Sequence, residues 1–167
     1  MTFNDIFKSS FLENVTEFSL TDEQIAALQP EHAELSASRV AGIINASIDE
    51  NTMKKLSGTT ITAWLMNMGL IEETPDNSGT MRKLPTSEGD RIGIVEREFD
   101  GAGKRVWYAA YNAEAQQFIF DNLDAIAEFA QNASEEKEFR KEKKNLVETF
   151  INAIMQQTKK NKLYRSE

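Results

Sequence analysis

The sequence of 167 residues contains no cysteine and only one histidine, and both facts exclude kinds of chemistry. Without cysteine the chain forms no disulfide, no thiolate metal site and no cysteine nucleophile. His32 has no second imidazole with which to share a metal ion or a catalytic triad, so we interpret it as a surface residue. No pair of carboxylates stands out by spacing and apolar surroundings. We therefore expect no catalysis, no cofactor and no metal site.

Long apolar runs are also missing from the sequence. No stretch approaches the roughly 18 residues that a membrane-spanning helix needs, and no signal-peptide pattern opens the chain. The lack of cysteine suits a reducing compartment. These observations predict a cytoplasmic protein that does not insert into membranes.

Basic side chains are scarce in the first third of the sequence. Residues 1–51 hold nine acidic and two basic side chains, whereas residues 52–111 hold eight of each, and the whole chain carries a net charge of −8. This balance argues against a general binder of polyanions. The neutral middle third is where local basic clusters could still contact a phosphate backbone.

The N-terminal flank, residues 1–35, begins with a segment rich in phenylalanine. Phe3, Phe7, Phe11 and Phe18 recur at helical spacing in TFNDIFKSSFLENVTEF. This face either packs onto the domain body or forms an exposed helix that docks on a partner. A short helix follows, because Thr21 and Gln24 match a capping box and Pro30 stops the helix.

Residues 36–131 predict a domain of helices followed by a hairpin. Ser36 or Ser38 caps a helix, and Ser57 or Thr59 caps a third helix that ends at Gly69. Four apolar residues of this third helix share its inward face: Ile61, Trp64, Leu65 and Met68. The cluster at 75–79 predicts a turn, and the runs 91–99 and 104–111 predict two strands joined by the glycine-rich turn 100–103.

The last part of the chain predicts two helices, one over about 113–131 and one that begins near Ser134. Residues 132–167 form an amphipathic helix that we expect to pack against a second copy of the chain. Its apolar stripe, the predicted dimerisation face, consists of Phe139, Leu146, Val147, Phe150, Ile151 and Ile154.

Two stretches of sequence resemble a known type of module. TTITAWLMNMGLIEE followed by LPTSEGDRIGI, and later VWYAAYNAEAQQFIFDNLDAI, is similar to winged helix-turn-helix modules of uncharacterised bacterial and phage-type proteins, some of them antirepressor-like. The resemblance covers roughly residues 36–128. It implies an α+β, mainly helical fold: a winged helix-turn-helix with a two-stranded wing at 91–111 and flanking N- and C-terminal helices.

The resemblance also implies that the third helix recognises DNA. Its outward residues would be Thr59, Thr60, Thr62, Ala63, Met66 and Asn67, and the threonine and asparagine side chains among them suit contacts with phosphates or bases. The helix itself carries no basic residue, so phosphate contacts would come from its neighbours. The candidate cations are Lys54, Lys55, Arg82, Lys83, Lys104 and Arg105.

Two functions remain open from the sequence. The first is a DNA-binding transcriptional regulator that acts as a homodimer and binds double-stranded DNA. The second is an acidic protein-interaction module, such as a phage-type inhibitor, that binds a protein and presents carboxylates where a nucleic acid has phosphates. The charge of the surface around the third helix and the hairpin separates the two.

Overall fold

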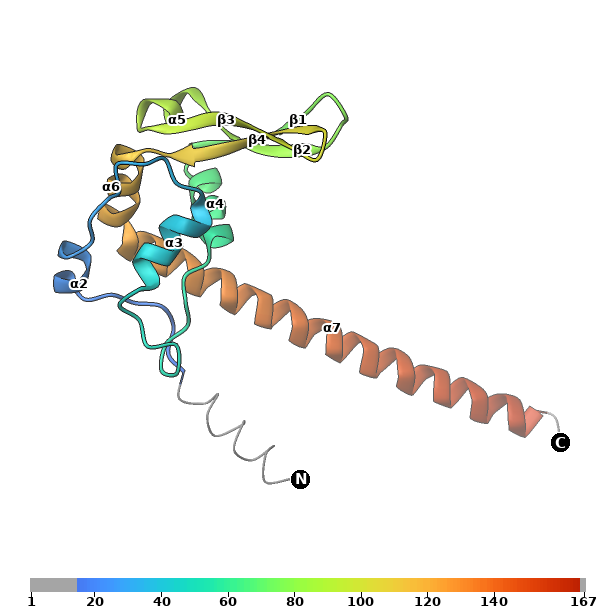
Figure 1. Ribbon diagram of the computed structural model, residues 1–167. Coiled ribbons are helices and arrows are strands. Elements are labelled where there is room, and N and C mark those ends of the chain that lie inside the picture. The colour runs from blue at the N-terminus through green and yellow to red at the C-terminus, as the bar shows by residue number, and fades with distance from the viewer. Residues whose placement is uncertain (1–14, 166–167) are drawn as a thin grey trace. The chain divides into compact units, whose positions relative to one another are not determined.

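A computed structural model describes residues 15–165 of the chain. The described residues form an α+β fold that is mostly helical, with two antiparallel hairpins and a long C-terminal helix (Figure 1). The helices are α2 (Asp22–Ala26), α3 (Ala37–Asn45), α4 (Gly58–Asn67), α5 (Ser87–Arg91), α6 (Ala113–Asp121) and α7 (Leu123–Arg165). The strands are β1 (Ile71–Pro75), β2 (Met81–Pro85), β3 (Ile94–Gly101) and β4 (Lys104–Tyr111).

The chain divides into two compact units between residues 130 and 131. The first unit holds both hairpins, the helices up to α6 and the first two turns of α7. The second unit holds the rest of α7. Phe3, Phe7 and Phe11, predicted as part of a docking helix, lie outside the described residues.

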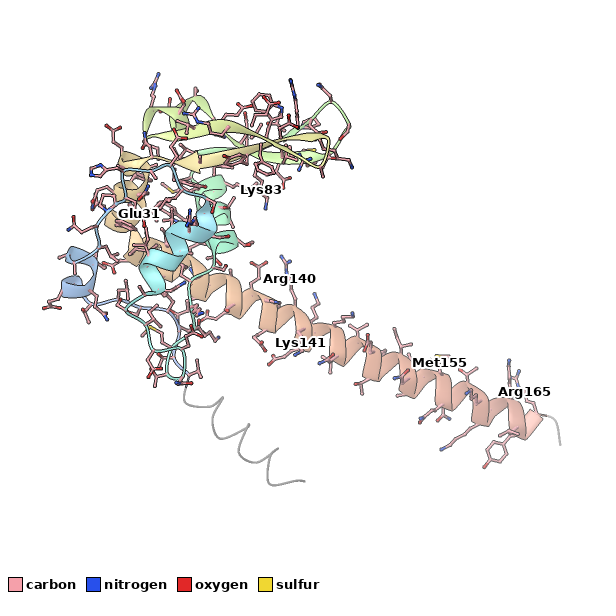
Figure 2. The ribbon with its side chains drawn as sticks, viewed as in Figure 1. Glu31, Lys83, Arg140, Lys141, Met155 and Arg165 are labelled. Carbon is pink, nitrogen blue, oxygen red and sulfur yellow. The ribbon has the colours of Figure 1, made fainter. Side chains whose placement is uncertain are left out.

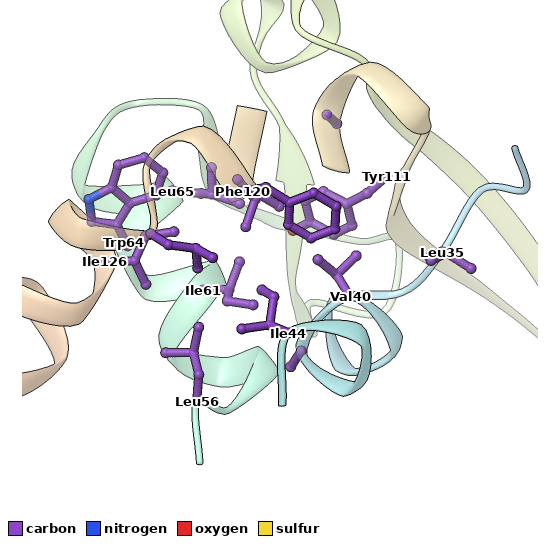
Figure 3. Packing of buried hydrophobic residues seen from close by; sticks show 14 of the residues in the cluster. Leu35, Val40, Ile44, Leu56, Ile61, Trp64, Leu65, Tyr111, Phe120 and Ile126 are labelled. Carbon is purple, nitrogen blue, oxygen red and sulfur yellow. The ribbon is translucent and has the colours of Figure 1, made fainter. Parts of the chain in front are cut away.

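The core of the first unit lies between α3, α4, α6 and the beginning of α7 (Figure 3). Each of these helices turns one apolar stripe inward, because its apolar residues recur every three or four positions. Trp64 of α4 contacts Phe118 of α6, with ring centroids 6.0 Å apart. The largest fully buried apolar side chains are Val40, Ile44, Ile61, Leu65, Ile94, Tyr111, Ile119, Phe120, Leu123 and Ile126.

The ends of the helices follow the capping signals in the sequence. Thr21 and Gln24 form the predicted capping box, and the hydroxyls of Ser36 and Ser57 cap α3 and α4. Gly69, with φ of 75°, ends α4. Its N–H donates to the carbonyl of Met66, and the next N–H, that of Leu70, donates to the carbonyl of Leu65, so that two terminal carbonyls are satisfied.

The two hairpins differ in how well the sequence predicted them. The hairpin of β3 and β4 is confirmed: its two-residue loop, Ala102 and Gly103, has positive φ at both positions, which matches the twist of the strands. The predicted strand start at Arg91 is wrong, because Thr86 caps the short helix α5 and the strand begins at Ile94. The stretch predicted only as a turn, 75–79, joins β1 to β2.

The hairpin of β1 and β2 changes the expected order of the elements. The hairpin that directly follows α4 is that of β1 and β2, not that of β3 and β4. The sheet predicted as the wing is therefore the later of two hairpins. Strand β2 lies against β4, so the two hairpins pack on each other without sharing a ladder.

Phe18 belongs to no helix and is 6 % exposed in the core, so at this residue the alternative of packing onto the domain body is confirmed and that of an exposed docking helix is wrong. Two further predictions are wrong. Met68, predicted to face inward, is 53 % exposed, because α4 has reached its C-cap there. The break expected between 131 and 134 lies at Asn122, whose amide donates to the carbonyl of Phe118. Residues 131–134 contain neither glycine nor proline, and α7 runs through them.

Two polar contacts hold the link between α2 and α3 on the first unit. The buried amide of Gln116 accepts a hydrogen bond from the N–H of Glu31 and donates to the carbonyls of Glu31, Ala33 and Tyr111. Arg97 of β3 donates two hydrogen bonds to the carboxylate of Glu34, at 2.8 and 2.6 Å, and this contact lowers the pKa of Glu34. The N-terminal flank is thereby part of the first unit from residue 15 onward.

Candidate nucleic-acid interface

The outward side of α4 is uncharged and mixes polar residues with Ala63 and Met66. The three buried apolar side chains of the helix face the core, and the opposite side exposes Thr59 and Asn67. Thr60 is partly buried, and its hydroxyl contacts that of Ser57 at 2.8 Å. No acidic or basic residue occurs between positions 58 and 67. The helix surface therefore neither attracts nor repels a phosphate by charge.

Thr62 makes a hydrogen bond within α4. Its hydroxyl donates to the carbonyl of Gly58 at 3.0 Å, and Thr62 and Tyr111 line the same cleft. Burial raises the pKa of Tyr111 to about 12, against the opposing effect of the nearby Thr62 hydroxyl. Thr62 is partly buried and lies at the wall of a cleft, so its predicted contact with DNA stays a prediction.

A cleft of about 370 Å³ runs beside α4. Thr62 lies at one wall, the start of α3 closes one end, and residues 81–83 of β2 and 106–109 of β4 form the rest. Lys83 lies on this side of its hairpin, in the space next to α4 (Figure 2). The structure thus brings two predicted cations, Arg82 and Lys83, to the cleft beside the predicted recognition helix.

Four of the six predicted cations already have carboxylate partners. Each pair joins an exposed or partly exposed lysine or arginine to an acid from a neighbouring segment. The pairs are Lys54 with Glu17 (2.6 Å), Lys55 with Glu50, Arg82 with Asp76 (3.0 Å) and Arg105 with Glu98 (3.1 Å). Lys83 and Lys104 have no carboxylate within 4 Å in the part of the chain that the structure describes, although Glu73 lies opposite Lys83 in the ladder.

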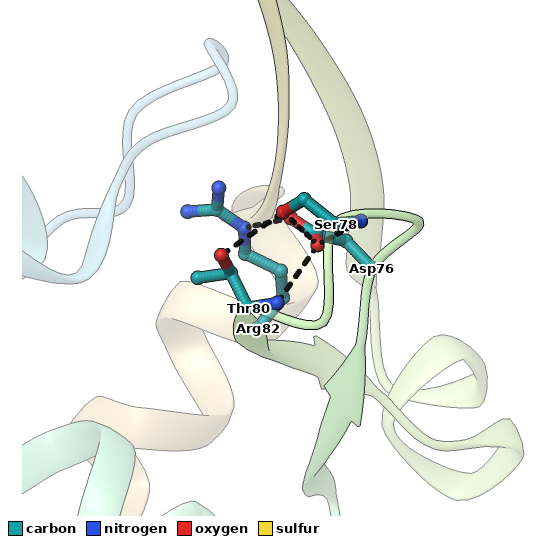
Figure 4. A network of polar contacts seen from close by, with 4 residues as sticks. All are labelled: Asp76, Ser78, Thr80 and Arg82. Carbon is teal, nitrogen blue, oxygen red and sulfur yellow. Dashed lines mark hydrogen bonds and ion pairs between the residues drawn. The ribbon is translucent and has the colours of Figure 1, made fainter.

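Asp76 organises the turn between β1 and β2 (Figure 4). Its carboxylate accepts hydrogen bonds from the Ser78 hydroxyl at 2.6 Å, from the N–H groups of Ser78 and Thr80, and from Arg82. The bond from the Ser78 hydroxyl contributes most, and together these donors lower the pKa of Asp76 to about 2. The arginine that the sequence suggested for DNA therefore has a structural role in this turn.

A second cleft, of about 440 Å³, separates the tips of the two hairpins. Trp107 lies in it at 40 % exposure, together with Arg82, Lys104 and Arg105. An exposed indole beside cations suits stacking on a base or on an arginine. Trp107 was not among the site residues predicted from the sequence. The signal that could have identified it is the alternation of side chains along β4, which places Trp107 on the same face as Arg105.

The hairpins and α5 carry many exposed acidic side chains, of which Glu98 lines the cleft between the hairpin tips. They are Glu72, Glu73, Glu88, Asp90, Glu96, Glu98 and Asp100. The interface around α4 is consequently mixed in charge, with two unpaired lysines among more numerous carboxylates.

In the second unit, the predicted dimerisation residues share an exposed face of α7. Each is about half exposed or more. The exposed fractions are 66 % for Phe139, 71 % for Leu146, 49 % for Val147, 67 % for Phe150, 49 % for Ile151 and 52 % for Ile154. No residue of this unit is buried within 131–165.

The described residues hold no group of three or more histidine, aspartate or glutamate side chains placed to bind a metal ion. Within the same residues, no helix combines the length and the apolar character that crossing a bilayer requires. Comparison of the chain with family models, curated proteins and solved structures found no match.

Proposed function

We propose that the protein is a winged-helix DNA-binding regulator that acts as a homodimer, with α4 as its recognition helix. The observation that carries this proposal is the placement of an uncharged helix face directly before a hairpin that brings Lys83 to its side. In a winged helix-turn-helix the hairpin after the recognition helix is the wing. Here the hairpin of β1 and β2 occupies that position, and the hairpin of β3 and β4 adds Lys104 and Trp107.

The two lysines without carboxylate partners carry the electrostatic part of this proposal. A cation already paired with a carboxylate must give up that partner before it binds a phosphate, whereas Lys83 and Lys104 need not. Phosphate contacts by lysine release counterions, so that affinity falls with salt, with a slope of about 0.9 in log–log form for each phosphate neutralised. Thr59 and Asn67 would then face the bases, because they are the polar residues exposed on α4.

The test is a titration of the full chain against a labelled duplex of mixed sequence, followed by fluorescence anisotropy at about 50 and 200 mM salt. The double variant Lys83→Glu, Lys104→Glu is expected to bind at least ten-fold more weakly and to lose about two from the salt slope. The double variant Lys54→Glu, Lys55→Glu is the matched control, because it makes the same change of net charge at two lysines that Glu17 and Glu50 already neutralise. Absence of binding at the lower salt concentration, or equal losses in both variants, contradicts the proposal.

A protein partner is the second candidate, and the ion pairs favour it. Carboxylates neutralise most of the candidate cations, and the hairpins expose apolar side chains: Phe99 is 62 % and Tyr108 39 % exposed. Aromatic side chains with this exposure are typical of protein interfaces. The test is a pull-down from native cell extract with the wild type and with Phe99→Ser. A stoichiometric protein partner that binds the wild type but not Phe99→Ser would support this function over DNA binding.

A further inference from the structure

The exposed apolar face of α7 is most concentrated over ten residues. Leu146, Val147, Phe150, Ile151, Ile154 and Met155 are 49–71 % exposed, and none of residues 131–165 is buried. An isolated helix gains little stability from its own backbone, and most helices in proteins are stabilised by packing of their apolar face. An apolar face of this kind on a long helix is therefore suited to a helical partner.

The spacing of this cluster makes it complementary to itself in one orientation. The six residues occupy positions i, i+1, i+4, i+5, i+8 and i+9, a pattern that is symmetric about the midpoint between Phe150 and Ile151. When a second copy runs in the opposite direction with that midpoint in common, apolar residues meet apolar residues at every position. Leu146 then lies opposite Met155, Val147 opposite Ile154, and Phe150 opposite Ile151.

The charges on either side of the cluster favour the same orientation. After Glu148 every charged residue of the described helix is basic: Lys159, Lys160, Lys162 and Arg165. A parallel pair would place these four cations beside the same four cations of the partner. An antiparallel pair in the register above places Arg165 opposite Glu136 and Lys159 opposite Glu142, although Lys160 then lies opposite Lys141. The facing segment 136–142 holds three acidic and three basic residues, so the four cations meet a neutral segment rather than four cations. Charges that flank an apolar seam set the orientation of paired helices.

We propose that α7 pairs with the same helix of a second copy in antiparallel orientation, with the two helices crossing at Phe150 and Ile151. The proposal rests on the homodimer in the proposed function and adds its orientation and register. It does not depend on the interface around α4, because every residue that carries it lies in the second unit. Figure 2 shows two of these side chains, Met155 and Arg165, on the helix.

The absence of cysteine allows a direct measurement of this register, because a single introduced cysteine is the only site for a spin label. In the full-length variant Arg165→Cys, the two labels of an antiparallel pair lie about 45 Å apart, since 29 residues at 1.5 Å separate them along the axis. In a parallel pair the same labels lie about 10 Å apart. Pulsed dipolar spectroscopy distinguishes these distances.

Glu148→Cys is the matched control, because it lies close to the proposed crossing and outside the apolar cluster. Its labels are expected within about 20 Å in either orientation, which shows that the labelled chain is dimeric. A short distance at position 165 overturns the proposal, and so does a monomer by light scattering at micromolar concentration. A second variant, Phe150→Glu, is expected to give a monomer whose first unit still unfolds cooperatively.

The outcome is separable from that of the DNA titration. An antiparallel dimer that does not bind duplex DNA at low salt supports the pairing of α7 and contradicts the function proposed for α4. A monomer that binds DNA with the predicted salt dependence supports the function proposed for α4 and contradicts the pairing of α7.

Discussion

The two units of the chain obtain their stability from different sources. Residues 15–130 bury a continuous core in which Phe120, Ile61 and Leu65 are almost inaccessible to solvent. Residues 131–165 bury none of their side chains, although Leu146, Phe150 and their neighbours are as apolar as the core residues. Apolar area stabilises a structure only when it is removed from water. The first unit therefore removes its own apolar core from water, whereas the apolar face of α7 stays exposed within the described residues.

The largest expected effect comes from removing one phenylalanine from each unit. Phe120→Ala is expected to lower the free energy of unfolding of the first unit by about 3–5 kcal/mol, because the ring is 1 % exposed and its loss leaves a cavity. Phe150→Ala is expected to change that free energy by less than about 0.5 kcal/mol. Both tryptophans lie in the first unit, so denaturant titrations followed by their fluorescence measure this unfolding.

The Phe150 variant has a second readout that separates the units. Its dimer is expected to dissociate at higher protein concentration than that of the wild type, while the tryptophan signal keeps its midpoint. Equal shifts of the tryptophan midpoint in Phe120→Ala and Phe150→Ala would contradict this difference, because Phe150 would then contribute to the stability of the first unit as much as Phe120 does.

A smaller effect is expected from two glycines that lie in helices of the first unit. A Cβ added at Gly58 would lie 2.7 Å from the backbone nitrogen of Ser38, so α3 and α4 would have to move apart. Gly58→Ala is expected to destabilise by about 1–3 kcal/mol. Gly42→Ala is the matched control within α3: no atom lies within 4 Å of the added Cβ, and the better helix propensity of alanine is expected to stabilise by about 0.5–1 kcal/mol.

Thermal unfolding by circular dichroism measures both glycine variants on the same scale. Opposite signs are expected, because the same chemical change meets a neighbouring helix at Gly58 and solvent at Gly42. Stabilisation by both substitutions would mean that the close approach of the two helices is not required.

Local signals in the sequence predicted much of the fold. The capping residues Thr21, Ser36 and Ser57 and the left-handed Gly69 act within a few residues, so their geometry follows from the sequence nearby. The hairpin at 94–111 was predictable for the same reason. The hairpin of β1 and β2 was missed because Glu72, Glu73 and Lys83 make its strands polar, and its stability comes from packing on β4 and from the Asp76 turn.

Long-range contacts decided what the sequence could not show at the candidate site. Arg82, Arg105 and Lys54 looked available for phosphates, yet each meets a carboxylate, and for Lys54 that partner is 37 positions away in sequence. Helical periodicity describes one helix and says nothing about Tyr111 from β4, which lines the same cleft as Thr62. Pattern alone identifies which residue types are present on a surface, and only tertiary structure shows which of them are already bonded.

The smallest expected effect is the pH-dependent contribution of Asp76 to the stability of the first unit. Hydrogen bonds to its charged form lower the pKa of Asp76 from 3.8 to about 2. A carboxyl group whose pKa is lower in the folded state stabilises the fold above its unfolded pKa, and this contribution is lost as the pH falls through the folded pKa. The melting temperature of wild type is therefore expected to exceed that of Asp76→Asn at pH 5–7 and to approach it as the pH falls from about 4 to about 2.

Glu128→Gln provides the control for this pH series, because Glu128 is exposed and makes no hydrogen bond or ion pair among residues 15–165. Its difference from wild type is expected to stay nearly constant over the same range. Tryptophan fluorescence is expected to report the destabilisation by Asp76→Asn, since Trp107 shares a cleft with Asp76 and Arg82. The distance between spin labels on α7 is expected to be the same in wild type and in Asp76→Asn. A pH-independent gap between wild type and Asp76→Asn would mean that the Ser78, Thr80 and Arg82 donors do not favour the charged carboxylate, and that the turn is held by the backbone ladder instead.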